Sequence, residues 1–246
     1  FQGHSFGNLF LAALEQISGD FEQAVLEASK ILTVQGDVLP VTTSNTQLQL
    51  TLPHGKVIIG EDDIQSIKLP QKDTFEISLT PTPSLSSAAR EKLLSADVIL
   101  IGPGNLYCSL LPVLLPEGMQ DVLSKTQAEI MFISNLMQKP LHTEGYTLGD
   151  YVEVIEKTLN RPLDYVLTNS SHISEEILNR YESLESATPI PQTFTSYHST
   201  ARIIEADIIS NTIGSQKKGD LLQRTLIRHS SDKLATFFSQ FIKTEV

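Results

Sequence analysis

Apolar residues recur at helical spacing near the start of the chain. A helix predicted over 4–18 carries them on one face, at Leu9, Ala13, Leu14 and Ile17. A second helix begins after Asp20, where Gln23 three residues later completes the capping-box pattern that opens many helices. We therefore expect two consecutive helices before the first strand.

The spacing changes over 36–82, where short apolar or alternating runs are typical of strands. The predicted strands are the runs VLPVT, LQLTL, KVIIG and FEISLTP, at 38–42, 48–52, 56–60 and 75–81. Pro53 and Gly55 lie between the second and third runs and favour the turn of a β-hairpin. We expect 36–82 to form a small α/β subdomain or insertion that contains this hairpin.

Helices and apolar strands alternate over the rest of the chain. Predicted strands cover 97–102, 129–135, 164–169 and 201–209, and predicted helices cover 86–95, 147–159, 174–183 and 232–242. Such alternation is typical of parallel βαβ units. We predict an α/β fold with a Rossmann-like, doubly wound, mostly parallel sheet, in which residues 1–246 form a single, incomplete domain.

Composition narrows the classes of function. The 246 residues carry a formal net charge of −11, which argues against binding of nucleic acid or an anionic membrane through Lys and Arg. A nucleotide ligand is compatible with this charge, because backbone N–H groups bind phosphates without a net positive charge. Cys108 is the one cysteine, and no Cys/His spacing resembles a zinc site. We expect a cytoplasmic protein. The sequence leaves its oligomeric state open, and a homo-oligomer is one alternative.

The run GHSFGN (3–8) precedes the first predicted helix. Backbone N–H groups at a helix start attract anions, so Ser5 or Asn8 would either cap the helix or touch a ligand. The alternative interpretation is a capped helix with two turn glycines, Gly3 and Gly7.

Two further polar segments follow neighbouring strands. GPGNLYCS (102–109) follows the apolar strand that begins at 97, and Asn135 ends the next strand. Ligands of open α/β sheets bind at the carboxyl ends of the strands, so we expect Gly104 and Asn135 to share one edge of the sheet. Two loops there would hold a diphosphate through main-chain amides. The alternatives are a tight turn that needs glycine and a simple Asx-turn.

Groups for acid–base chemistry are fewer. His142, Glu144 and Asp150 are candidates, although solvated loop residues are the alternative, and the catalytic residues stay unassigned. Arg228 beside His229 would bind a phosphate or carboxylate bidentately, or form a surface ion pair. Cys108 has no assignable His partner and is interpreted as a core residue.

Taken together, these segments resemble one family. GHSFGNLFLAAL, GDVLPVT, PHGKVIIGEDDI, ADVILIGPGNLYCSLLPVLL, NLMQKP and EGYT occur in that order. They look like the bacterial gluconeogenesis-factor family, of the same superfamily as 2-phospho-L-lactate transferase. The similarity extends from Gly3 to about Asp150 and thins out beyond it.

The resemblance implies a ligand and a set of binding residues. One branch of the superfamily is understood to bind UDP-N-acetylglucosamine and to act in cell shape and cell-wall precursor control during gluconeogenic growth. The other branch transfers a phospholactyl group from a guanosine-diphosphate-activated donor to a deazaflavin coenzyme precursor, with magnesium. The matching positions are Gly3, His4, Ser5, Gly7, Asn8, Gly102, Pro103, Gly104, Asn105, Tyr107, Ser109, Asn135, Tyr181 and Arg228.

The chain also departs from the family pattern. The family motif GPGSxYTS has Ser and Thr where this chain has Asn105 and Cys108, and the family's TQPGET reads QKPLHT here. The latter change replaces Gly by Leu141 and Glu by His142, and a family His is Tyr151. The family's opening glycine-rich turn and its aspartates have no match, so we interpret Phe1 as a cut inside a longer protein. Magnesium would depend on that preceding segment, and no metal ligand is assigned here.

Three hypotheses follow. The first is a non-enzymatic regulator that binds a nucleoside-diphosphate sugar. The second is a phospholactyl-type transferase, and the third is a scaffold with a vestigial pocket. We also expect the 246-residue chain alone to bind poorly, because it would lack a strand of its sheet.

Overall fold

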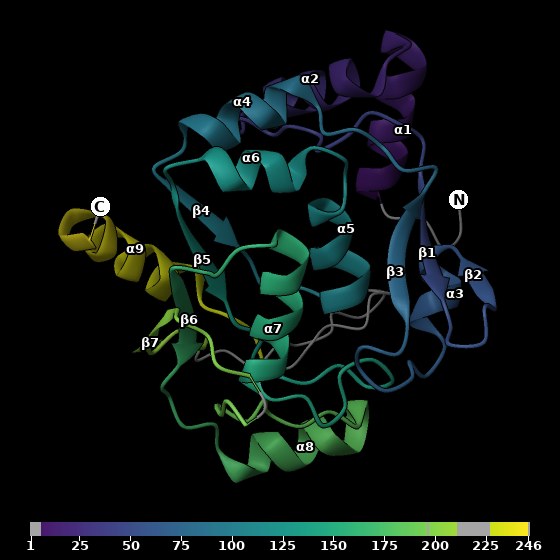
Figure 1. Ribbon diagram of the computed structural model, residues 1–246. Helices are drawn as coiled ribbons and strands as arrows, with labels where there is room; N and C mark the ends of the chain where they lie inside the picture. Colours follow the sequence, from purple (N-terminus) through teal and green to yellow (C-terminus); the bar gives the residue numbers. More distant parts are fainter. Residues whose placement is uncertain (1–5, 196, 211–226, 246) are drawn as a thin grey trace.

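Two sheets and the helices around them make up the computed structural model, which describes residues 6–195, 197–210 and 227–245 (Figure 1). In chain order the elements are α1 (Phe6–Ser18), α2 (Phe21–Ile31), β1 (Gln47–Thr51), β2 (Val57–Ile59), α3 (Glu61–Gln65), β3 (Glu76–Thr80), α4 (Ser87–Ser95), β4 (Val98–Ile101), the π-helical η1 (Leu106–Leu110), α5 (Leu111–Leu114), α6 (Met119–Lys125), β5 (Glu129–Ile133), α7 (Leu148–Leu159), β6 (Tyr165–Asn169), α8 (Glu175–Glu185), β7 (Arg202–Ala206) and α9 (Ser231–Glu245). The predicted α/β class is confirmed.

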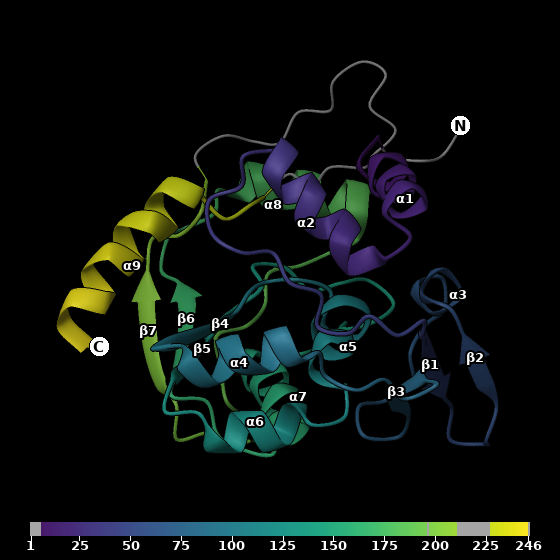
Figure 2. The same cartoon turned by 90° about the horizontal axis from the view of Figure 1, so that it is seen from above.

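The larger sheet is parallel, with strand order β4-β5-β6-β7. Alternate side chains of β5 enter different cores: Ile130 and Phe132 pack with α5 and α7, while Met131 and Ile133 pack with α9. Figure 2 shows α9 beside β6 and β7, with α6 and α7 on the opposite side of the sheet. Helices thus cover both faces, as burial of a parallel sheet requires.

The smaller sheet is antiparallel, with strand order β2-β1-β3. The predicted hairpin is confirmed, and Gly55 takes a φ of 77° in its turn, a conformation that glycine adopts without strain. Leu48 and Leu50 of β1 are buried with Ile64 of α3 in the same core as η1 and α7. This shared core fixes the small sheet beside the carboxyl ends of β4 and β5.

The strand predicted over 38–42 is wrong. Pro40 has no N–H to donate to a ladder, and the carbonyl groups of this segment are used elsewhere. Pro40 O accepts from the Ser86 hydroxyl at 2.7 Å, and Val41 O accepts from Ser86 N at 2.8 Å. The extended segment therefore holds the N-cap residue of α4. The sequence analysis also missed α6, which buries Met119, Val122 and Leu123.

An apolar groove of about 750 Å³ lies along the outer edge of β4. Among the described strands, β4 pairs only with β5. We name this hollow the edge groove; Leu39, Val41, Ile99, Leu100 and Gly102 are among its lining residues.

In the described ranges, every helix is too short or too polar to cross a membrane.

Candidate functional site

Two loops converge at the carboxyl ends of β4 and β5, as the sequence predicts. Asn135, after β5, donates from Nδ2 to the carbonyl of Gly104, after β4, over 2.7 Å. Beside them lies a cavity of about 780 Å³, which we name the strand-end cavity. It is lined by Gln65, Pro103, Gly104, Asn105, Ser109, Asn135, Leu136, Met137, Gln138, Lys139, Pro140, Leu141, Tyr181, Ala187, Ile227, Arg228 and His229.

Half of the residues matched to the family line this cavity. They are Pro103, Gly104, Asn105, Ser109, Asn135, Tyr181 and Arg228. The others lie elsewhere: Gly102 lines the edge groove, and Gly7 and Asn8 are exposed in the first turn of α1. Tyr107 is buried, with its hydroxyl 2.6 Å from that of Tyr146, away from the cavity. Gly3, His4 and Ser5 lie outside the described residues.

The strand-end cavity is cationic in an acidic chain. Lys139 and Arg228 line it, and no Asp or Glu occurs among its described lining residues, although the chain carries a net charge of −11. His229 adds no charge near neutral pH, because burial lowers its pKa by more than the contact of its Nε2 with the Ser134 carbonyl, at 3.0 Å, raises it. The sequence analysis missed Lys139; its place just after the end of β5 was the signal for it.

Asn105 occupies several of the amides that the sequence analysis assigned to a diphosphate. Its Oδ1 accepts from the backbone N–H groups of Tyr107 and Cys108 at 3.2 and 3.3 Å. Its carbonyl accepts from Ser109 N and Leu110 N at 2.8 and 2.9 Å. The backbone therefore offers a ligand fewer amides than predicted, and the two cationic side chains become more important for anion binding.

Gly104 is needed for close packing within this turn. A Cβ built there would lie 3.1 Å from Leu110 Cδ2, tighter than ordinary van der Waals contact. Glycine thus lets the turn approach η1 closely while its carbonyl stays bonded to Asn135.

Asn135 carries an unsatisfied acceptor. Within the described part of the chain, its Oδ1 is a buried side-chain atom with no hydrogen-bond partner. Exchanging its oxygen and nitrogen would place two oxygens together at Gly104, so the Nδ2 bond fixes the orientation. A buried acceptor without a donor costs about 1–3 kcal/mol, which a ligand N–H or O–H group would recover.

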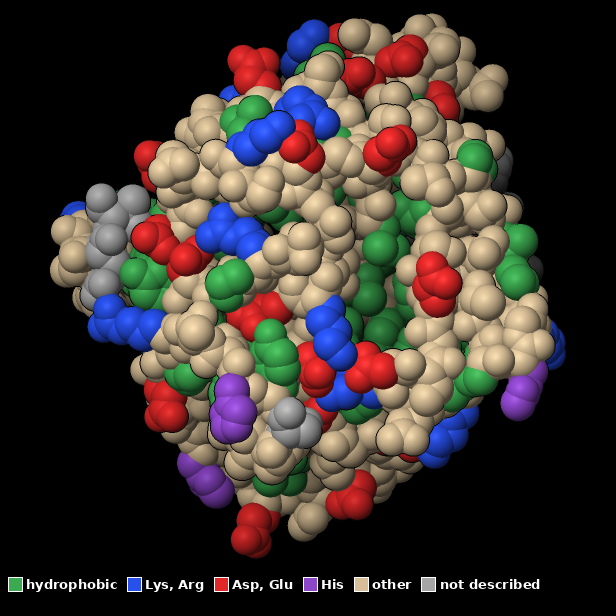
Figure 3. All heavy atoms as spheres, in the orientation of Figure 1, with side chains coloured by type: hydrophobic (Ala, Val, Ile, Leu, Met, Phe, Trp, Pro, Cys, Tyr) green, Lys and Arg blue, Asp and Glu red, His purple; other side chains and the backbone are tan. Residues whose placement is uncertain are grey.

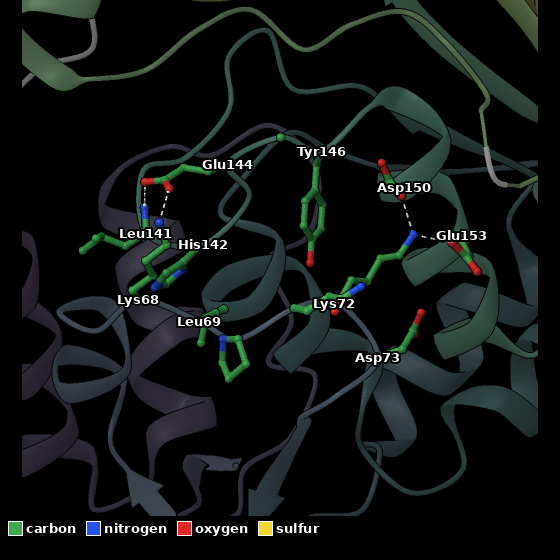
Figure 4. Close-up of a pocket in the computed structure, with 13 residues that line it drawn as sticks. Lys68, Leu69, Lys72, Asp73, Leu141, His142, Glu144, Tyr146, Asp150 and Glu153 are labelled. Atoms are coloured by element: carbon green, nitrogen blue, oxygen red, sulfur yellow. Dashed lines mark hydrogen bonds and ion pairs between the residues drawn. The ribbon is translucent and has the colours of Figure 1, made fainter. Parts of the chain in front are cut away.

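A second cavity of about 620 Å³ lies between the small sheet and α7 (Figure 4). Lys72 reaches between Asp150 and Glu153, bonding to both, in a partly buried ion-pair triad. Burial alone would lower the pKa of Lys72, but its hydrogen bonds to the two carboxylates outweigh burial and raise it. We name this hollow the ion-pair cavity.

The three candidate acid–base residues lie at this second cavity and have structural partners. Asp150 completes a capping box with Thr147 at the start of α7, in addition to its bond to Lys72. Glu144 accepts from Leu141 N at 2.9 Å and pairs with Lys68 at 2.7 Å (Figure 4). His142 is buried behind the turn at 102–109.

Cys108 does have a histidine neighbour, contrary to the sequence analysis. Its Sγ lies 4.0 Å from His142 Nδ1. Burial raises the pKa of the Cys108 thiol to about 11, and burial lowers the pKa of His142. At neutral pH the pair is a thiol and a neutral imidazole, so Cys108 remains a core residue rather than an activated nucleophile.

A hollow of about 200 Å³ separates α5 from β3. Figure 3 shows hydrophobic side chains on its floor, with basic and acidic side chains gathered below it. Tyr107, Leu111 and Leu115 line it together with Phe75, whose ring meets that of Tyr107 edge-on with centroids 5.1 Å apart. This packing explains why Tyr107 is buried here, and no contact with a ligand is needed to explain it.

A family model described as 2-phospho-L-lactate transferase CofD matches residues 1–209. The chain belongs to this family. The predicted resemblance is therefore confirmed, and the strand-end cavity lies largely within the matched residues.

Proteins named as gluconeogenesis factors are among the relatives that this chain matches. The chain is 34% identical over 244 residues to the gluconeogenesis factor of Bacillus subtilis, covering 98% of this chain and 72% of that protein. It is 36% identical over 191 residues to that of Halalkalibacterium halodurans, covering 76% and 58%. A Nostoc relative is 35% identical over 236 residues, and the chain spans about half of its length, 49%.

Solved structures show the same fold. The crystal structure of a UPF0052-family protein from Bacillus halodurans superposes with a TM-score of 0.79 at 28% identity. The match covers 96% of this chain and 72% of that one.

Magnesium, which the family resemblance implies for the transferase branch, does not fit the described residues of this CofD-family chain. No three His, Cys, Asp or Glu side chains of the described ranges converge as a metal site. The strand-end cavity offers no carboxylate from its described lining, whereas Mg²⁺ prefers oxygen ligands that include carboxylates. We derive no step through a metal held by these residues.

Proposed function

We propose that this chain acts as a gluconeogenesis factor that binds a sugar nucleotide of the UDP-N-acetylglucosamine type in the strand-end cavity. Its role is regulatory and non-enzymatic, in bacterial cell shape and cell-wall precursor control during gluconeogenic growth. The similarity to the gluconeogenesis factors of two bacilli supports the class of protein.

The charge of the strand-end cavity carries the proposal. Lys139 and Arg228 favour an anion, and no carboxylate of the described lining opposes it. Asn135 Oδ1 favours a hydrogen-bond donor in the same ligand. A nucleoside diphosphate sugar combines a diphosphate anion with hydroxyl and N–H donors, and the cavity of about 780 Å³ is in the range of small-molecule sites.

The test is calorimetry on the full-length protein with UDP-N-acetylglucosamine and with UDP. We expect both to bind and the sugar nucleotide to bind more tightly, because the sugar adds donors and contact area. Affinity for the sugar nucleotide no better than for UDP would exclude a sugar-specific role.

A second candidate function is phospholactyl transfer, which the family description favours. The assay incubates the full-length protein with magnesium, a guanosine-diphosphate-activated phospholactyl donor and the deazaflavin coenzyme precursor. Turnover would establish this activity, and its absence with detectable sugar-nucleotide binding would leave the regulatory role.

A further inference from the structure

His142 lies behind the wall of the strand-end cavity and joins two parts of the fold. It is 4% exposed, and its Nε2 lies 3.1 Å from the carbonyl of Ile64. Ile64 belongs to α3, the helix that packs against the small sheet. Its Nδ1 lies 3.4 Å from the side-chain amide of Asn105, which begins η1 and lines the cavity. His142 itself faces the ion-pair cavity rather than the strand-end cavity.

The hydrogen bonds fix the tautomer of His142. A carbonyl only accepts, so the imidazole proton is on Nε2 and donates to Ile64 O. Nδ1 is then an acceptor; it lies 3.4 Å from both Nδ2 and Oδ1 of Asn105, and of these two atoms only Nδ2 can donate to it. Oδ1 of Asn105 is left to accept from Tyr107 N and Cys108 N, as observed. Neutral His142 and the two backbone N–H groups therefore favour the same orientation of the Asn105 amide.

Residues from two distant segments come together at this point. His142 is 37 residues from Asn105 and 34 residues from Cys108 in sequence, yet it contacts both. Burial raises the pKa of the Cys108 thiol and lowers the pKa of His142, so both are neutral near pH 7. The three residues thus form one neutral set that supports the turn.

We propose that His142 is a positioning residue for ligand binding, which sets the amide of Asn105 and thereby the turn that walls the strand-end cavity. The proposal rests on the proposed function of that cavity. It also links the small sheet to ligand binding, because the same imidazole is anchored on Ile64 of α3.

Protonation would break this arrangement. A proton on Nδ1 would remove the acceptor for Asn105 Nδ2, and the new donor would compete with Tyr107 N and Cys108 N for Asn105 Oδ1, which lies at the same 3.4 Å. The titratable and charged groups nearest this set are Cys108 on η1, Glu61 on α3 and Lys139 on the segment of His142 itself. The ion-pair cavity that His142 also lines adds Lys68, Lys72, Asp73, Glu144, Asp150 and Glu153. Burial and Lys139 lower the pKa of His142, so we expect affinity to fall only as the pH drops below the usual histidine range.

Two substitutions separate positioning from packing. His142→Asn places an amide oxygen near the position of Nδ1 and keeps the acceptor for Asn105. His142→Gln places an amide nitrogen near the position of Nε2 and keeps the donor for Ile64. Both remove the ring, so we expect similar decreases in melting temperature. We expect the affinity for UDP-N-acetylglucosamine to fall about tenfold in His142→Gln and less than about threefold in His142→Asn, as for loss of one hydrogen bond.

The outcomes distinguish the two proposals. If the wild-type protein binds the sugar nucleotide and both variants lose affinity equally, or His142→Asn loses more, the positioning role is wrong and the proposed function stands. If the wild-type protein binds neither UDP nor the sugar nucleotide, both proposals fall. Affinity should decrease between pH 7.5 and pH 5.5 in the wild type and stay constant in His142→Asn; the same decrease in both would overturn the role of protonation.

A measurement without substitution covers the case in which the variants do not fold. Nitrogen-15 shifts of the imidazole in the wild-type protein report which nitrogen carries the proton. We expect the Nε2–H tautomer at pH 7.5. The Nδ1–H tautomer would contradict the proposal.

Discussion

The strand-end cavity and the ion-pair cavity share Leu141 as a wall and differ in how their charges are used. In the ion-pair cavity, Lys72 is held by two carboxylates, and Lys68 is paired with Glu144. In the strand-end cavity, two cationic residues line a space without a described carboxylate, and the buried Asn135 Oδ1 has no donor among the described residues. Paired charges hold two layers of the fold together in the first cavity, whereas the second combines positive charge with an open acceptor, which suits an anionic ligand.

The largest effect is expected from breaking the ion-pair triad. Lys72→Met leaves Asp150, at 15% side-chain exposure, without its cation and leaves Glu153, at 14%, with only the exposed Lys157 as a partner. We expect a loss of about 3 kcal/mol in the free energy of unfolding, the lower end for a broken buried pair. Urea denaturation measures it.

The matched control is Lys68→Met, whose ion pair is exposed and should contribute at most about 0.5 kcal/mol. Equal losses in the two variants would show that burial does not distinguish these pairs. Neither substitution should weaken sugar-nucleotide binding by more than about threefold, as expected for residues that make no ligand contact.

The next effect is on binding and separates the cavities directly. Arg228→Met removes a cationic residue that lines the strand-end cavity, and loss of a charge-assisted hydrogen bond should weaken UDP-N-acetylglucosamine by about 2 kcal/mol, or about thirtyfold. Calorimetry measures it, with Lys68→Met as the control from the other cavity. Binding unchanged in Arg228→Met and in Lys139→Met would rule out the cationic cavity as the anion site.

Much of this comparison was predictable from the sequence. The alternation of apolar strands and helices predicted the parallel sheet, and polar residues after two neighbouring strands predicted that Gly104 and Asn135 would meet. The non-local contacts were not predictable: Lys72 pairs with residues 78 and 81 positions away, and His142 meets Ile64 across 78 positions. The local sequence pattern also predicted a strand around Pro40 that does not form. The backbone there is held instead by a hydrogen bond to Ser86, which lies far along the chain.

A smaller effect concerns pH. Burial lowers the pKa of both His142 and His229, so the folded protein binds fewer protons than the unfolded chain. The contribution of these two histidines to the free energy of unfolding is then constant above about pH 6.5 and falls as the pH drops, by up to about 1.4 kcal/mol per pH unit for each histidine. Urea unfolding at pH 7.5 and 5.5 tests this. A protein equally stable at both pH values would contradict the burial of these neutral rings.

The smallest effect concerns the shared wall. Leu141 has a φ of 69°, in the left-handed region of the backbone that favours glycine. Leu141→Gly and Leu141→Ala remove nearly the same contacts, but only glycine relieves the left-handed backbone. We expect the free energy of unfolding of the glycine variant to be about 1 kcal/mol higher than that of the alanine variant. An alanine variant of equal or greater stability would show that no strain is stored there.

The central claim is that a sugar nucleotide occupies the strand-end cavity, and a crystal structure of the full-length protein with UDP-N-acetylglucosamine tests it most directly. We expect the diphosphate beside Lys139 and Arg228, and a ligand N–H or O–H group donating to Asn135 Oδ1. A ligand seated in the ion-pair cavity or the edge groove, with Asn135 Oδ1 still without a partner, would contradict the account.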